Sequence, residues 1–227
     1  MTHIEGRKDD DLLLQKGGNA FPHIIFMDDE GGVVAVQNDR TVAGFEKTYK
    51  GDVQRFLELR AKAQSGDAAA QIEFALLEGS LGRITFDETR KRLEGKNLSD
   101  AQKAALADVE MGAMIGALHG SQDEASAKAA MKTIADAFAA GRVPSGTEQK
   151  RQFLEAALQY GLVEKNADLA QKAFDAIKPV YEELAGKDNP RLQQWIRETA
   201  DMIEDMRPAK DAGNDSGIEE GCGGGGK

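Results

Sequence analysis

The sequence has few cysteines, few histidines and no long apolar run. Its single cysteine, Cys222, excludes an internal disulfide, an internal dithiol redox pair and a cysteine-based zinc site. The three histidines, His3, His23 and His119, lie in distant segments, so we expect no histidine-rich metal site and no cofactor. No apolar run approaches the roughly 20 residues of a membrane-spanning helix. The chain also begins without an uninterrupted apolar segment of signal-peptide length.

Positive charge is scarce relative to negative charge. The 29 Lys and Arg residues against 39 Asp and Glu give a formal net charge of -10 and a pI near 4.9. Nucleic-acid backbones and anionic membrane surfaces attract clustered Lys and Arg, so we expect neither as the main partner. The 41% hydrophobic and 30% charged composition is ordinary for a globular protein. We therefore predict a soluble, cytoplasmic protein, or a periplasmic or secreted one if further sequence precedes Met1.

Composition divides the chain into three zones. Residues 1–65 contain the β-like signals, residues 66–207 are Ala-rich and helix-periodic, and residues 208–227 are rich in Gly and acidic residues. The last zone is too poor in apolar residues to order itself, so we predict a disordered tail. Cys222 in this tail is interpreted as an incidental thiol. The alternative is an exposed reactive thiol that forms a mixed disulfide, carries a modification or binds a metal with another chain.

A β-hairpin is predicted near the N-terminus. Pro22 opens the first strand, over residues 23–27, and a β-branched run over residues 33–36 forms the second strand. The Asp-Asp-Glu-Gly-Gly segment between them supplies turn-forming carboxylates and glycines that tolerate positive φ. Asp28 and Asp29 are therefore interpreted as turn formers. They are not expected to work as an acid–base pair, because no base or nucleophile stands near them in the sequence.

The segment from residue 10 to residue 65 resembles the C-terminal half of a thioredoxin fold. The motif Phe-Pro-x-x-x-Phe-x-Asp, which begins at Phe21 and is followed by Gly-x-Val, is similar to the cis-proline loop and last hairpin of that family. The resemblance implies a cis peptide bond at Pro22 and a peptide-binding role for Phe21, Pro22 and His23. The alternative, from the residues alone, is a trans proline that opens an edge strand and a partly exposed strand histidine.

The flanking segments extend the resemblance, but the redox half of the fold has no counterpart. We expect a helix end that closes at Gly17-Gly18, and after the hairpin a loop at Gly44-Phe45 and a helix over residues 51–63. The family's Cys-x-x-Cys lies well upstream of its proline loop, yet only 21 residues precede Pro22 and none is Cys. Such a stretch is too short for a parallel strand pair with a helical crossover. Because a lone hairpin is marginal in water, it must lean on the helices or on a partner.

The Ala-rich zone is predicted to form an α-hairpin bundle or a tetratricopeptide-like helical array. Apolar residues recur at helical spacing over 169–184 and 192–206, and Asn189-Pro190 marks the start of the second helix. These two helices should pair antiparallel. Further helix starts have the spacing of a reciprocal capping box, namely Thr85–Glu88, Ser99–Gln102, Ser121–Glu124 and Ser145–Glu148. We interpret the array as non-repetitive, because no second segment restores the full tetratricopeptide pattern.

The large apolar residues of this zone are interpreted as core. Trp195 lies within the 192–206 stripe, and Met111 and Met114 lie on one apolar helix face. Paired helices of this kind leave a broad polar and Ala-rich surface exposed. Such surfaces are typical of proteins that bind peptides or other proteins.

Three functions fit the sequence, in the following order. The first is a redox-inactive, thioredoxin-like unit fused to a helical extension, which acts as a protein or peptide interaction module and is not an enzyme as given. The second is the C-terminal fragment of a thiol–disulfide oxidoreductase whose Cys-x-x-Cys half lies upstream. The third is an all-α scaffold with a coincidental hairpin pattern. Turnover in an insulin-reduction assay would refute the first, and a helix across residues 24–36 would exclude the resemblance to thioredoxin.

Overall fold

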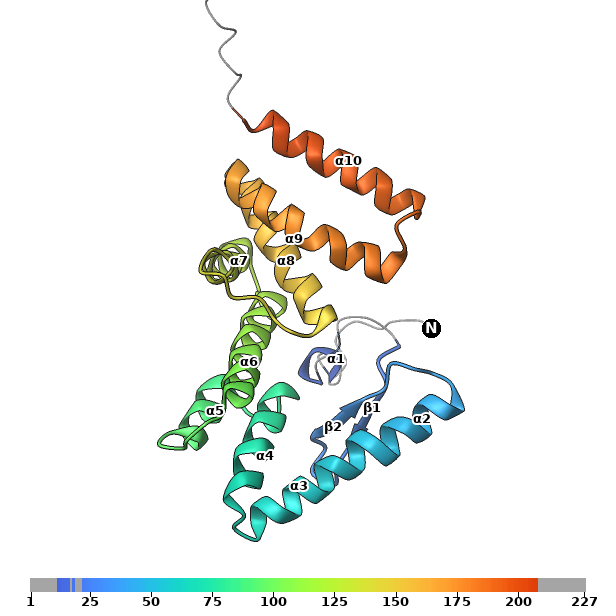
Figure 1. The fold of residues 1–227 in the computed structure, drawn as a ribbon, viewed down its shortest axis with the longest axis vertical. Coiled ribbons are helices and arrows are strands. Elements are labelled where there is room, and N and C mark those ends of the chain that lie inside the picture. The colour runs from blue at the N-terminus through green and yellow to red at the C-terminus, as the bar shows by residue number, and fades with distance from the viewer. Residues whose placement is uncertain (1–11, 17, 19–21, 208–227) are drawn as a thin grey trace, which may run out of the picture.

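The computed structural model describes residues 12–16, 18 and 22–207, and these are mainly helical with one two-stranded sheet (Figure 1). The N-terminal elements are α1 (Leu12–Gln15), β1 (Ile25–Met27), β2 (Val33–Val36), α2 (Val42–Thr48), the π-helical turn η1 (Tyr49–Val53) and α3 (Gln54–Gln64). The later helices are α4 (Ala68–Ser80), α5 (Phe86–Leu93), α6 (Asp100–His119), α7 (Glu124–Ala139), α8 (Thr147–Val163), α9 (Ala167–Ala185) and α10 (Pro190–Asp205). The predicted fold class, mainly α with a small β-hairpin, is confirmed, and the chain is not all-α.

The hairpin forms where the sequence predicts it, although its first strand begins later than residue 23. Strands β1 and β2 pair antiparallel, with Ile25 opposite Val36 and Phe26 opposite Ala35, and the register shifts after Phe26. Strand β2 is buried on both faces, because the consecutive residues Val33, Val34 and Ala35 are all buried. The hairpin therefore rests on the helices that follow it, as its small size requires.

The turn between the strands is organised by one carboxylate. Asp28 accepts hydrogen bonds from the backbone N–H groups of Glu30 (3.2 Å) and Gly32 (2.8 Å). Gly31 takes a φ of 74°, in the left-handed region that favours glycine. Asp28 is thereby confirmed as a turn former.

The helix after the hairpin begins earlier than predicted. Thr41 accepts a hydrogen bond from the backbone N–H of Gly44 and caps α2, which continues through η1 into α3. Gly44 and Phe45, which were expected in a loop, are helical. A Cβ at Gly44 would lie 2.6 Å from the carbonyl oxygen of Asp39, so the glycine lets the incoming loop pass close to the helix.

A buried ionic cluster attaches the hairpin to the helices. Arg83, in the loop after α4, donates a 2.7 Å hydrogen bond to Asp28, whose side chain is only 4% exposed. Arg60 of α3 lies 3.6 Å from the same carboxylate. The Arg83 guanidinium also lies 5.0 Å from the ring centroid of the fully buried Phe56, which packs edge-to-face on Phe74 of α4. The core under the hairpin thus includes a helix of the predicted second domain.

In residues 66–207, some helices begin at the predicted capping residue and others do not. Thr85 caps α5, and Ser99 forms the predicted reciprocal box with Gln102 at the start of α6. Helix α7 begins later than predicted, because Asp123 forms a reciprocal box with Ser126. Asp123 is therefore the capping residue in place of the expected serine two positions earlier.

The predicted capping serine of α8 has a different role. The N-cap of α8 is Gly146, which makes no side-chain hydrogen bond. The backbone N–H of Ser145 donates to Asp108 of α6 at 3.0 Å, and its hydroxyl donates to the same carboxylate. The hydroxyl is thereby occupied, and the serine ties the loop before α8 to α6.

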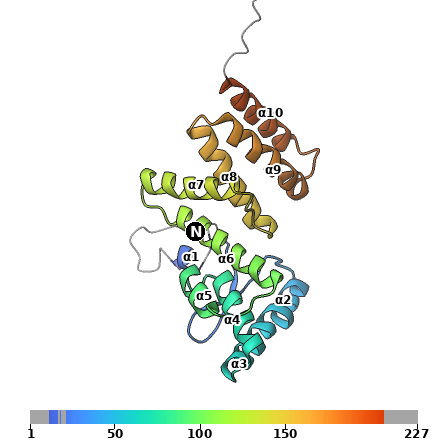
Figure 2. The same cartoon turned by 60° about the vertical axis from the view of Figure 1, so that its left-hand side comes forward.

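Helices α7 to α10 stack on one another and hold the largest core (Figures 1 and 2). Side chains that are almost fully buried include Ile134 of α7, Phe153 of α8, Ile177 of α9 and Ile203 of α10. Both predicted apolar stripes are confirmed by the bounds of α9 and α10 and by their buried residues, and the two helices form an antiparallel hairpin. Asn189 caps α10 and Pro190 is its first residue, as predicted.

Candidate functional site

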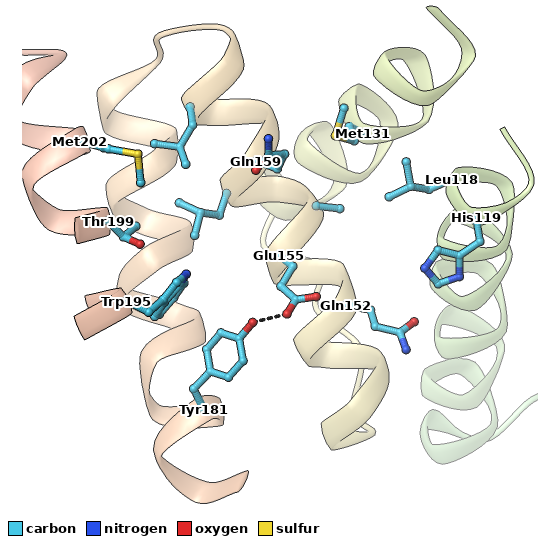
Figure 3. A pocket seen from close by; sticks show the side chains of 13 residues that line it. Leu118, His119, Met131, Gln152, Glu155, Gln159, Tyr181, Trp195, Thr199 and Met202 are labelled. Atoms are coloured by element: carbon cyan, nitrogen blue, oxygen red, sulfur yellow. Dashed lines mark hydrogen bonds between the residues drawn. The ribbon is translucent and has the colours of Figure 1, made fainter. Parts of the chain in front are cut away.

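A groove of about 460 Å³ lies over α8 (Figure 3). Helix α8 forms its base, α6 and α7 lie on one side, and α9 and α10 lie on the other. Its lining residues are Leu118, His119, Met131, Gln152, Glu155, Ala156, Leu158, Gln159, Leu162, Tyr181, Trp195, Thr199 and Met202. The walls are therefore mainly apolar, with a small number of polar groups set among them.

Helix α8 turns one face to the core and another to the groove. Phe153 and Leu154 are buried almost completely. Gln152, Glu155 and Gln159 line the groove, and their i, i+3, i+7 spacing places them in one row along the helix. We call these three residues the polar row. The core packing of α8 fixes the direction in which this row points.

Glu155, in the middle of the polar row, belongs to a small ionic network. Arg151 donates to Glu155 at 2.5 Å and to Glu148 at 2.6 Å. The Tyr181 hydroxyl donates to the same oxygen of Glu155, Oε1, as Figure 3 shows. The other oxygen, Oε2, has no hydrogen bond or ion pair with any residue in the described part of the chain. Two carboxylates and one guanidinium leave this network with one formal negative charge.

Burial and contacts within this network shift the pKa values of its side chains. Burial, followed by the hydrogen bond to Glu155, raises the pKa of Tyr181 to about 12. The hydrogen bond from Arg151 lowers the pKa of Glu148, and that same bond raises the pKa of Arg151. At neutral pH the phenol therefore stays protonated and continues to donate to Glu155.

An aromatic cluster forms the wall next to Glu155. The ring of Trp195 packs edge-to-face on Tyr181, with centroids 4.8 Å apart, and at a tilt on Phe174, with centroids 5.7 Å apart. The apolar spacing of residues 192–206 predicts Trp195 in the core. Trp195 does pack against the core, but it is only half-buried and also lines the groove.

Several polar groups of the groove have no partner within the protein. Among the residues that the structure describes, the side chains of Gln159 and Trp195 make no hydrogen bond, and both line the groove (Figure 3). Thr199 also lines the groove, but it is only 1% exposed. Gln152 uses its amide N–H to donate to Glu148. The groove thus offers the amide of Gln159 and the indole N–H of Trp195 between apolar walls.

The residues predicted as a peptide-binding site lie elsewhere. Pro22 is exposed, and His23 is half-buried with its Nε2 3.1 Å from the carbonyl oxygen of Lys16. Neither residue lines the groove. Phe21 and Cys222 lie outside the described residues. The binding role predicted for Phe21, Pro22 and His23 stays a prediction.

Comparison with known proteins finds no relative: no protein-family model, no curated protein and no solved structure matches the chain. Within residues 12–16, 18 and 22–207, no group of three or more His, Cys, Asp or Glu could hold a metal ion. No helix in these ranges has the length and apolar character needed to cross a membrane. The groove itself is therefore the feature of the described residues that indicates a function.

Proposed function

We propose that this chain is a protein-interaction module that binds an extended peptide segment of a partner protein in the groove over α8. The observation that carries this proposal is the pair of unpartnered polar groups on Gln159 and Trp195 between apolar walls. The amide offers both a donor and an acceptor and the indole offers a donor, and these match the acceptors and donors of a peptide backbone. The apolar walls provide surface on which the side chains of the peptide lose contact with water.

The N-terminal unit has a supporting role in this proposal. The hairpin and the helix after it, which resemble the last part of a thioredoxin fold, are held on α3 and α4 by the ion pairs of Asp28 and by Phe56. We propose that this unit carries out no thiol chemistry and stiffens the N-terminal end of the helical array. The exposed Pro22 remains available for a second contact with the partner.

Selection of peptides from a random displayed library on the 227-residue chain tests the proposal. Gln159→Tyr fills the groove from an exposed position on α8, and Gln194→Tyr makes the same change on α10 outside the groove lining. We expect selected peptides to bind the wild type and Gln194→Tyr equally and to lose affinity for Gln159→Tyr. Equal binding to all three proteins would place the peptide elsewhere and overturn the proposal.

A further inference from the structure

We propose, building on the groove as a peptide-binding site, that it recognises a basic residue flanked by apolar residues. The basic side chain, Lys or Arg, would pair with Glu155 in the middle of the polar row. The apolar neighbours would pack on the walls of the groove. This inference names the chemistry of the partner segment, which the proposed function leaves open.

The charge of the groove is the first argument. Glu155 is the only Asp, Glu, Lys or Arg among the lining residues, and its Oε2 has no partner among the described residues. The adjacent Arg151 does not neutralise the site, because it is shared between Glu155 and Glu148. One negative charge remains for a cation to pair with, and a half-buried carboxylate forms stronger charge-assisted hydrogen bonds than one in open water.

The aromatic wall is the second argument. Tyr181 connects the two features, because its hydroxyl bonds Glu155 and its ring contacts Trp195. A Lys or Arg side chain that reaches Glu155 along this wall would lay its aliphatic stem and its charge against aromatic rings, a favourable cation–π arrangement. Figure 3 shows Glu155 and both rings on the same part of the groove.

The spacing of the polar row is the third argument. Gln152 and Gln159 are seven residues apart in α8, which corresponds to about 10 Å along the helix axis. An extended peptide rises about 3.3 Å per residue, so about three residues span this distance. With its backbone held by the two glutamine amides, the middle residue lies beside Glu155. Because successive side chains of an extended peptide point to opposite sides, the residues that enter the groove with the basic residue are those two positions before and after it. The preferred segment is therefore apolar–x–basic–x–apolar.

The test uses the tightest peptide from the selection described above and its analogues. Replacing its basic residue by Gln should weaken binding about ten-fold, the effect of one hydrogen bond between charged groups. Glu155→Gln should weaken binding of the original peptide by a similar factor and leave the Gln analogue unaffected. Gln152→Glu, which adds a second carboxylate to the polar row, should tighten the original peptide and steepen its dependence on salt.

The outcomes separate this inference from the proposed function. Peptides that bind the groove without enrichment of Lys or Arg, and without response to Glu155→Gln or Gln152→Glu, would overturn the inference and keep the proposed function. Because Gln152→Glu changes a side chain outside the core, it remains informative if Glu155→Gln does not fold. Self-association that Gln159→Tyr abolishes would show a second copy of the chain as the occupant and overturn both proposals.

Discussion

Replacing Arg83 by Met should detach the hairpin from the helices. Arg83 is 11% exposed and pairs with Asp28, which is 4% exposed, at 2.7 Å. Met retains most of the side-chain length and can still contact Phe56, so the main changes are the loss of the positive charge and of the 3.3 Å hydrogen bond to the Val33 carbonyl oxygen. The variant leaves a buried carboxylate without its closest cation.

The change in the free energy of hairpin opening depends on the contacts that Asp28 keeps in the variant. Removal of one partner from a buried ion pair costs about 3–5 kcal/mol. Arg60 remains 3.6 Å from the carboxylate, and two backbone N–H groups still donate to it. We therefore expect the lower end of this range, about 3 kcal/mol, for the opening of the hairpin. This corresponds to about a hundredfold faster hydrogen exchange of hairpin amides that open locally.

Native-state hydrogen exchange of the Gln37 amide, which donates to the carbonyl oxygen of Ile24, provides the assay. Arg90→Met is the matched control, because Arg90 and its partner Asp87 are 71% and 84% exposed. An exposed pair contributes about 0–1 kcal/mol, so the control should leave exchange nearly unchanged. Equal exchange rates in the two variants would show that the Arg83–Asp28 pair does not hold the hairpin on the helices.

Acid should have the same effect in the wild type. Burial alone would raise the pKa of Asp28, but the hydrogen bonds from Arg83 and Gly32 lower it below its ordinary value of 3.8. A carboxyl with a lowered folded pKa contributes stability above its unfolded pKa and loses it as the pH falls through the folded value. Exchange at Gln37, corrected for the intrinsic pH dependence, should accelerate below pH 3.8 in the wild type, and by a smaller factor in Arg83→Met.

Four further perturbations test the helical array. Gly161→Ala should lower the free energy of unfolding by about 1–3 kcal/mol in a denaturant titration, because its Cβ would lie 2.7 Å from the Ala170 nitrogen. Gly116→Ala, with nothing within 4 Å, should be neutral or stabilising. Ser99→Ala should cost about 1 kcal/mol through loss of the α6 cap. Tyr181 should ionise near pH 12, and the corresponding step in phenolate absorbance should be absent from Tyr181→Phe. Because its folded pKa is raised, Tyr181 contributes stability below pH 10.0, and this contribution should disappear as the pH approaches 12.

Local patterns in the sequence predicted the elements well. The structure confirms the features that depend on residues close together in the sequence. These features are the β-branched run, the Asp-Asp-Glu-Gly-Gly turn and the apolar stripes of α9 and α10. The errors arose where a tertiary contact decided the outcome. Ser145 has the spacing of a capping residue, but its hydroxyl bonds Asp108, which lies 37 residues away. Gly44 was expected in a loop, but it lies inside α2, where the absence of a side chain allows Asp39 to approach the helix closely.

The groove was missed because it is made by helices that are distant in the sequence. Trp195 follows the apolar period of α10, so the pattern alone places it in the core. The one local signal was the polar row on α8, whose members at i, i+3 and i+7 stand beside the buried residues in the middle of that helix. The same row also fits an ordinary surface helix whose polar side faces solvent, so it does not by itself indicate a groove. Only the packing of α6 and α10 beside it makes the row the base of a groove.

The central claim, that a peptide binds over α8, can be tested at a single atom. The chain has one tryptophan, so the indole N–H of Trp195 gives one unambiguous NMR signal at the wall of the groove. Titration with a selected peptide should shift this signal saturably, with the same Kd as an independent binding assay, and Gln194→Tyr should leave the shift intact. A peptide that binds with this Kd while the Trp195 signal stays unchanged would contradict the account.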